Sequence, residues 1–218
     1  LIFAAIGYGL NNGLQALIAR RAGENKPDEI GGLFSQGVLI GLLMAVVGII
    51  VTWTLTPYLF SLIIHDPEVQ KKAVEFLRSR IWGLPFLYIY QLRNALLVGT
   101  NQSRYLVAGT LAEATTNIAL DYVLIFGLWG FPELGFNGAA IASVIAEFVG
   151  MFVLFLVIRW KGISKRFGLF RQLRWNKYNN SLIFSMSAPL MFQHAISIIS
   201  WQFFFLLTEH HGDMALKV

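Results

Sequence analysis

The stretch GAAIASVIAEFVGMFVLFLVIRW, residues 138–160, decides the fold of this chain. It is almost wholly apolar, and its one acid is Glu147. About 20 apolar residues in a helix cross a bilayer core of about 30 Å, and this stretch has that length. It shows no alternation of polar and apolar residues, and it is about twice as long as a strand of a membrane barrel. We therefore expect a transmembrane helix here.

Five other stretches have the same character. The six expected spans are residues 1–19, 33–59, 81–101, 106–128, 138–160 and 182–207. The composition agrees, because 56% of the 218 residues are hydrophobic and only 13% are charged, whereas a typical soluble domain carries about 25% charge. The expected fold class is an all-α, polytopic membrane protein. The absence of cysteine excludes a disulfide framework, a thiolate nucleophile and a Cys-ligated metal.

Lys and Arg residues predict the orientation, because they are retained on the cytoplasmic side. Every second connection is basic: residues 20–26, Arg104, and above all residues 159–177, which hold seven bases and no acid. We expect these connections to be cytoplasmic, so that the first span runs from outside to inside. Residues 159–177 are expected to lie on anionic lipid headgroups. Nucleic acid is not an expected partner, because a basic loop beside a membrane needs none.

Small residues recur at every fourth position in three of the spans. In lipid such stripes let two helix backbones approach closely, so they predict packing seams. The stripes are Ala5, Gly9 and Gly13; Gly37, Gly41 and Ala45; and Gly138, Ala142, Ala146 and Gly150.

Glu113, Asn117 and Asp121 are four residues apart and therefore share one face of the fourth span. An ionisable residue at mid-membrane costs about 2.5–3.5 kcal/mol on insertion scales, so this face needs an explanation. The oxygens of Asn117 and Asp121 suit a hard cation such as Na⁺. The Asp121 carboxylate could instead carry a proton. A purely structural hydrogen-bond network between helices is the alternative.

Other polar residues fall inside the predicted spans. Gln91 and Asn94 in the third span could face the same pocket as Asp121. In the last span Gln193 and His194 follow a proline by about one turn and could line a substrate cavity. No metal site other than the possible Na⁺ site is expected.

Glu147 follows Gly135, Ala139 and Ser143 at four-residue spacing, so it projects from a close-packed seam. We expect it to form a structural ion pair with Arg93 or Arg104.

Three segments together carry a family resemblance: GLQALIARRAGE at residues 13–24, NIALDYVLIFG at 117–127 and LGFNGAAIA at 134–142. In this order and spacing they resemble the multidrug and toxic compound extrusion (MATE) family of secondary transporters. That family has twelve helices in two six-helix lobes, so the resemblance implies that the spans are helices two to seven.

The resemblance also implies a division of the chain. Residues 1–160 would be part of the N-terminal lobe, with five helices and the first family helix missing. Residues 161–180 would be the basic cytoplasmic loop between the lobes, and residues 181–218 the truncated first helix of the C-terminal lobe. The apolar start without methionine and the abrupt end also suggest an internal fragment.

The resemblance implies specific ion-site residues. Asn117 and Asp121 match an Asn and an Asp on helix five of family members with a cation site in the N-terminal lobe. Asn94 matches a helix-four asparagine, and Gln91 stands where those members have a second one. Ala139 stands in place of a helix-six threonine, and the helix-one aspartate lies outside this chain. Because the chain also lacks a mid-depth glutamate on helix seven, the choice between Na⁺ and H⁺ stays open.

The function expected from the resemblance is a cation-coupled antiporter that exports cationic or amphipathic compounds by alternating access. It would be a multi-pass protein of a bacterial inner membrane, with no cofactor besides the coupling ion. Its partners would be small-molecule substrates, membrane lipids and the missing helices of the same polypeptide. One alternative is a lipid-linked oligosaccharide flippase, which needs a basic cavity, although mainly Arg93 lies within the spans. The other is an intramembrane enzyme, but no catalytic motif occurs at membrane depth, so we expect no enzyme.

Overall fold

The computed structural model describes residues 2–64, 66–170 and 174–210. Within these ranges the protein contains helices and no strands, as the sequence predicts. The long helices are α1 (Ile2–Gly23), α2 (Pro27–Ile63), α3 (Pro67–Arg80), α4 (Leu84–Gly99), α5 (Leu106–Phe126), α6 (Phe136–Trp160) and α8 (Lys177–His210). The short ones are η1 (Ile81–Gly83), η2 (Ser103–Tyr105), η3 (Leu128–Gly130) and α7 (Ile163–Arg166).

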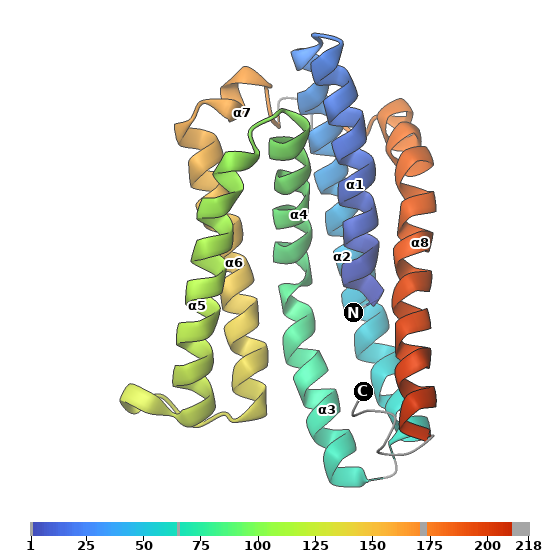
Figure 1. The fold of residues 1–218 in the computed structure, drawn as a ribbon, viewed down its shortest axis with the longest axis vertical. Helices are drawn as coiled ribbons and strands as arrows, with labels where there is room; N and C mark the ends of the chain where they lie inside the picture. The colour runs from blue at the N-terminus through green and yellow to red at the C-terminus, as the bar shows by residue number, and fades with distance from the viewer. Residues whose placement is uncertain (1, 65, 171–173, 211–218) are drawn as a thin grey trace.

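The long helices run side by side along the long axis of the molecule (Figure 1). α5 and α6 pair on one side, and α1, α2 and α8 lie on the other side. α4 lies between the two groups and contacts α1, α2 and α6, while α3 continues below it and also contacts α6 (Figure 1). The α3–α4 rod therefore links the two halves of the bundle.

The third predicted span begins too late. The helix starts at Pro67, not at residue 81, and continues through the 3-10 turn η1 into α4. Pro85 falls in the first turn of α4, where its missing N–H removes no helical hydrogen bond. The predicted span starts only at residue 81 because α3 is rich in charged and polar residues, so hydropathy does not detect it. The last span likewise begins earlier than predicted, at Lys177 and not at residue 182.

Three of the described helices are long and apolar enough to cross a membrane by themselves: α2 over Pro27–Leu62, α6 over Phe136–Trp160 and α8 over Lys177–Phe205. The other expected spans fall in α1, in the α3–α4 rod and in α5. Polar residues such as Asn11 and Asn12 in α1 and Glu113 in α5 lower the hydropathy of these helices.

The core lies where α1, α2 and α4 meet. Leu14 of α1, Phe34 of α2 and Leu96 of α4 are among its fully buried side chains. The predicted packing seams are present, and the α1–α8 contact shows this. A Cβ on Gly9 would lie 2.5 Å from the Met191 Cα, and one on Gly13 would lie 2.7 Å from the Ser187 Cα.

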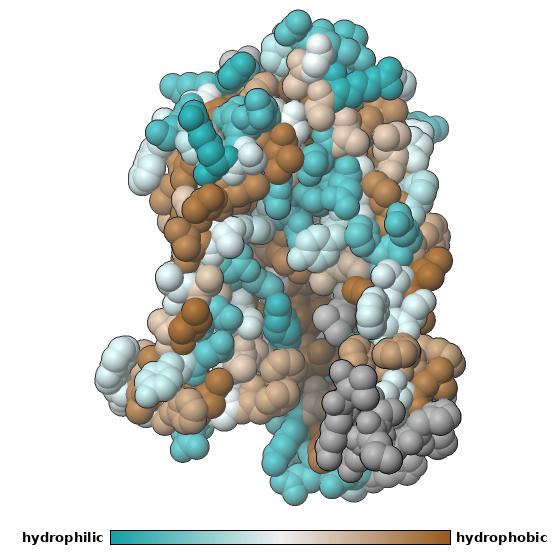
Figure 2. Space-filling view, viewed as in Figure 1, coloured by the Kyte–Doolittle hydropathy of each residue, from teal (hydrophilic) through white to brown (hydrophobic). Residues whose placement is uncertain are grey.

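The basic connections share one end of the bundle. The α1–α2 connection, the α4–α5 connection and α7 all lie at the top of Figure 1. Hydrophilic residues cover this end, and they also extend down the middle of the visible face (Figure 2). This placement agrees with the alternation of basic connections in the sequence. Residues 171–173 of the basic connection and residues 211–218 of the predicted last segment lie outside the described residues.

Candidate ion-coupling site

The α5–α6 pair is formed by a hairpin whose turn begins with Gly127. Gly127 has φ +65°, a left-handed conformation that glycine adopts without strain. The small-residue stripe of α6 then faces α5. A Cβ on Gly138 would lie 2.7 Å from the carbonyl oxygen of Leu124, and one on Gly150 would lie 2.9 Å from the Glu113 Cβ. The two helices are therefore in close contact along the face that carries Glu113, Asn117 and Asp121.

Asn117 and Asp121 are both partly buried on α5. The Nδ2 of Asn117 donates a hydrogen bond of 3.4 Å to the Oγ of Ser143 on α6. The Oδ1 of Asp121 is buried and has no hydrogen-bond donor among the described residues. A buried carboxylate oxygen without a donor is costly. A bound cation or a proton would remove that cost, and the Asn117 oxygen lies one helical turn away to act as a second ligand.

Gln91 and Asn94 lie on α4. Gln91 is buried and Asn94 partly buried, and neither side chain makes a hydrogen bond within the described part of the chain. α4 packs against α1, α2 and α6 and has no extensive contact with α5. The structure thus does not show the two α4 amides in contact with Asn117 or Asp121.

Gln193 and His194 lie on α8, in the other half of the bundle. Gln193 is exposed. The Nε2 of His194 lies 3.2 Å from the Nδ2 of Asn12 on α1, and the His194 ring lies 6.5 Å from that of Tyr8. His194 thus joins α8 to α1, and the described residues show no contact between this pair and the α5 polar face.

Glu147 pairs with Arg80, so the expected pairing with Arg93 or Arg104 is wrong. Arg80 donates from Nη1 and Nη2 to the two carboxylate oxygens, at 3.1 and 2.5 Å. The Glu147 side chain is 7% exposed and that of Arg80 is 34% exposed. Glu147 lies near the middle of α6, roughly 15 Å or more from either end at 1.5 Å per residue. The ion pair is therefore deep in the bundle.

The predicted third span begins at residue 81, so it leaves Arg80 just before the start of the helix. A signal for the true start is present in the sequence. Asp66 precedes Pro67, and its carboxylate accepts hydrogen bonds from the backbone N–H groups of Glu68 and Val69 at 2.8 and 3.3 Å. An Asp cap followed by proline is a common helix start, and it would have placed Arg80 in the fourth turn of the helix.

Arg93 is buried and contacts α6. Its Nη1 donates to the backbone carbonyl of Met151 on α6, and its guanidinium lies 5.4 Å from the centre of the Phe155 ring. It therefore acts as a link between α4 and α6.

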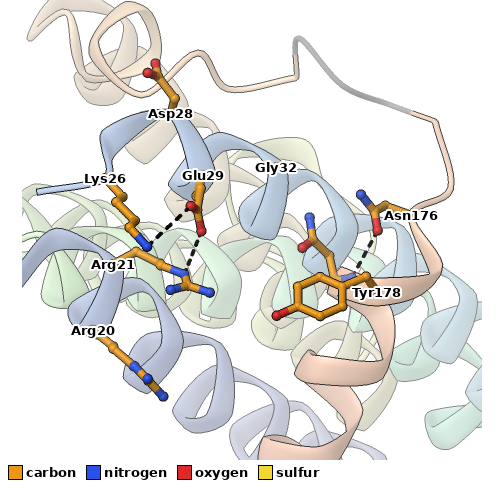
Figure 3. Close-up of a pocket in the computed structure, with 9 residues that line it drawn as sticks. Arg20, Arg21, Lys26, Asp28, Glu29, Gly32, Asn176 and Tyr178 are labelled. Carbon is orange, nitrogen blue, oxygen red and sulfur yellow. Dashed lines mark hydrogen bonds and ion pairs between the residues drawn. The ribbon is translucent and has the colours of Figure 1, made fainter. Parts of the chain in front are cut away.

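A pocket of about 650 Å³ lies at the basic end of the bundle, between the α1–α2 connection and the start of α8 (Figure 3). Two of its bases share one carboxylate: Arg21 contacts Glu29 at 2.8 Å, and Lys26 contacts the same carboxylate at 3.8 Å. We read it as a surface ion-pair network, because it is far from the buried polar groups of α5 and α6. The residues lining it are Arg20, Arg21, Lys26, Asp28, Glu29, Gly32, Asn176, Tyr178 and Asn179.

A family model described as MatE matches residues 1–123. The chain is similar to the probable multidrug resistance protein NorM of Bacillus anthracis, with 30% identity over 176 residues, 79% of this chain and 39% of the relative. It is 33% identical to a NorM of Halalkalibacterium halodurans, over 79% of this chain and 38% of the relative. The chain thus spans about two fifths of the length of these curated relatives.

Solved structures show the same fold at low sequence identity. A structure described as MATE in complex with MaL6 is 20% identical and has a TM-score of 0.81, covering 95% of this chain and 45% of that one. An inward-facing conformation of a multidrug resistance MATE family transporter is also 20% identical, with a TM-score of 0.79 over 89% of this chain and 43% of that one. These likenesses bear on the fold alone.

Proposed function

The chain belongs to the multidrug and toxic compound extrusion family of membrane transporters, and we propose that it is part of a cation-coupled exporter of cationic or amphipathic compounds. Most of its residues would form the N-terminal lobe, and α8 would begin the C-terminal lobe. The relatives' names describe multidrug resistance proteins, which supports export as the function of the full-length protein. A bacterial inner membrane is its proposed location, because the named relatives are bacterial.

The observation that carries the coupling proposal is the buried Oδ1 of Asp121, which has no donor among the described residues. We assign the coupling ion, Na⁺ or H⁺, to Asp121, with the side-chain oxygen of Asn117 as a second ligand for Na⁺. The Asn117 Nδ2 is bound to Ser143, and this leaves the amide oxygen free to face the ion. Fixing the amide in this way would orient a ligand before the ion arrives.

Coupling requires that the ion bind the two states of alternating access with different affinity. Occupancy of Asp121 would then shift the population between a state open to the outside and a state open to the cytoplasm. Each elementary charge that crosses 100 mV supplies about 2.3 kcal/mol. That amount supports about a fortyfold concentration of substrate, because 1.4 kcal/mol is a factor of ten.

The two alternatives receive less support. A flippase for pyrophosphate-linked lipids needs free basic groups in its cavity, and Arg93 is committed to the Met151 carbonyl and the Phe155 ring. Membership of a family of transporters supports the expectation that the chain is not an enzyme.

The test uses the full-length protein reconstituted in lipid vesicles. Efflux of a fluorescent organic cation is driven either by an imposed Na⁺ gradient or by an imposed pH gradient. We expect Asp121→Asn to abolish the response to the ion that couples transport, because the neutral amide can neither hold a cation tightly nor exchange a proton.

Glu133→Gln is the matched control, since it removes an exposed acid from the same hairpin. It should leave both responses unchanged. If Asp121→Asn exports as fast as the unaltered protein under both gradients, Asp121 is not the coupling residue.

A further inference from the structure

A polar seam continues from the proposed ion site toward the middle of the bundle. Glu113 is two turns from Asp121 on α5, and Glu147 is one turn from Ser143 on α6. The Asn117–Ser143 hydrogen bond joins the two helices between these points. At its inner end the seam meets Arg80 of α3, which is bound to Glu147 through two hydrogen bonds.

Two glycines provide the space for the carboxylates of this region. A Cβ on Gly83, which is buried in η1, would lie against the Oε2 of Glu147 and 2.7 Å from the Nη1 of Arg80. A Cβ on Gly150 would lie 2.9 Å from the Glu113 Cβ and 3.1 Å from its Oε2. Side chains at either position would occupy the space of the acids. The glycines at positions 83 and 150 therefore leave room for the side chains of Glu147 and Glu113.

The charges of the region do not balance. Glu113 lies against Gly150, which follows Glu147 by three residues on α6, so the Glu113 side chain is within about one helical turn of the Arg80–Glu147 pair. At this spacing Arg80 attracts both carboxylates, and the two carboxylates repel each other. With both acids ionised, the cluster of Glu113, Glu147 and Arg80 carries a net charge of −1. An uncompensated charge in a low-dielectric interior is unfavourable, and protonation of one member is the usual relief.

No other described group nearby supplies the missing positive charge. Arg93 of α4 is bound to the Met151 carbonyl. Arg78 of α3 lies over the Trp53 ring, with 5.0 Å between its guanidinium and the ring centre. Tyr90 of α4 hydrogen-bonds to Thr110 at 3.0 Å, and a tyrosine carries no positive charge in either protonation state.

We propose that Glu113 and Glu147 together bind one proton, with Arg80 as their shared counter-charge, at a site distinct from the Asp121 site. Because Glu147 is buried and held by Arg80 while Glu113 is partly exposed, the proton enters at Glu113. One O–H bond forms between a carboxylate oxygen and a proton taken from water, and no other covalent bond changes. The two acids titrate as a unit, as strongly interacting groups do. The site exists whether or not Asp121 binds the coupling ion.

Infrared spectroscopy of the full-length protein in phospholipid vesicles tests this proposal, because a protonated carboxyl group has its own C=O stretching band. As the pH is lowered from neutral, the unaltered protein should gain a band before ordinary carboxyl groups titrate, and Glu113→Gln should remove this band. Glu147→Gln should remove the same band, since the remaining Glu113 carboxylate would then balance Arg80 alone. Glu133→Gln is the control and should keep the band. Asp121→Asn should keep it as well, which separates this site from the proposed coupling site.

Glu113→Gln decides the outcome, because the Glu113 side chain makes no hydrogen bond within the described residues and its replacement should not prevent folding. Loss of intensity equal to one carboxyl group supports the proposal. A Glu113→Gln spectrum that keeps the full band of the unaltered protein overturns it. Retention of the band in Glu147→Gln would show that Glu113 is protonated independently of Arg80, and it would also overturn the shared site.

Discussion

Gly83 is the residue on which the geometry of the Arg80–Glu147 pair depends. Any side chain at this position would occupy the space of the Glu147 carboxylate. We expect Gly83→Ala to displace the carboxylate and to destabilise the protein by about 1–3 kcal/mol, as overpacking at a buried site does. Thermal unfolding of the detergent-solubilised protein measures the change.

Gly23→Ala is the matched control for this substitution. Nothing lies within 4 Å of a Cβ placed on Gly23. Its unfolding temperature should remain that of the unaltered protein or rise slightly. Equal unfolding temperatures for Gly83→Ala and Gly23→Ala would show that the ion pair tolerates a methyl group at Gly83.

For single residues, the sequence predicts which side chains share a helix face but not which residue of another helix they contact. The shared face of Glu113, Asn117 and Asp121 follows from helical periodicity alone. In the structure Glu113 lies against Gly150 of α6, Asn117 bonds to Ser143 of α6, and Asp121 is partly buried. The partner of Glu147 does not follow, because a contact between α3 and α6 joins residues 67 positions apart. Periodicity within one helix carries no information about which neighbouring helix supplies the partner.

Among the connecting elements, the α1–α2 connection carries a network of charged side chains. Arg21 and Arg20 donate hydrogen bonds to Glu24 at 2.6 and 3.0 Å and lower the pKa of this exposed carboxyl from 4.5 to about 2. Because the pKa is lower in the folded protein, the stabilising effect is present above pH 4.5. It is lost as the pH falls toward 2.

We expect the Glu24 carboxyl to titrate near pH 2 in the folded protein. Carbon NMR of protein with isotope-labelled glutamate measures this, with Glu24→Gln to assign the signal. In Arg21→Ala the titration should move back toward 4.5, because the stronger of the two hydrogen bonds is removed. A Glu24 signal that titrates at the same pH in both proteins would contradict the assigned cause.

The elements themselves were largely predictable, because long apolar runs in this chain are all helical. The exception is α3, a polar helix that extends a span beyond its apolar part. Hydropathy detects segments that prefer lipid. Most residues of α3 are polar or charged, so hydropathy does not detect this helix. Its start is set by a local hydrogen-bonding pattern, the Asp66 cap before Pro67. Predicting the ends of helices requires such signals in addition to hydropathy.

The orientation of the whole molecule in the membrane can be tested directly. The 218 residues contain no cysteine, so a single introduced cysteine reports one position, once cysteines elsewhere in the full-length protein are replaced. Glu133 and Lys165 are exposed at opposite ends of α6. We expect a membrane-impermeant maleimide to label Glu133→Cys in intact cells and Lys165→Cys only after permeabilisation, because basic connections stay in the cytoplasm. The reverse pattern would invert the orientation.

The depth of Glu147, near the middle of α6, has an electrical consequence. A proton that reaches this depth from the outside has crossed about half of the membrane potential. Since a full crossing is worth about 2.3 kcal/mol per 100 mV, each 100 mV changes the binding free energy of that proton by about 1 kcal/mol. The occupancy of the Glu113–Glu147 site would therefore respond to membrane voltage as well as to pH, and an energised cell would load it more fully from outside than a depolarised one.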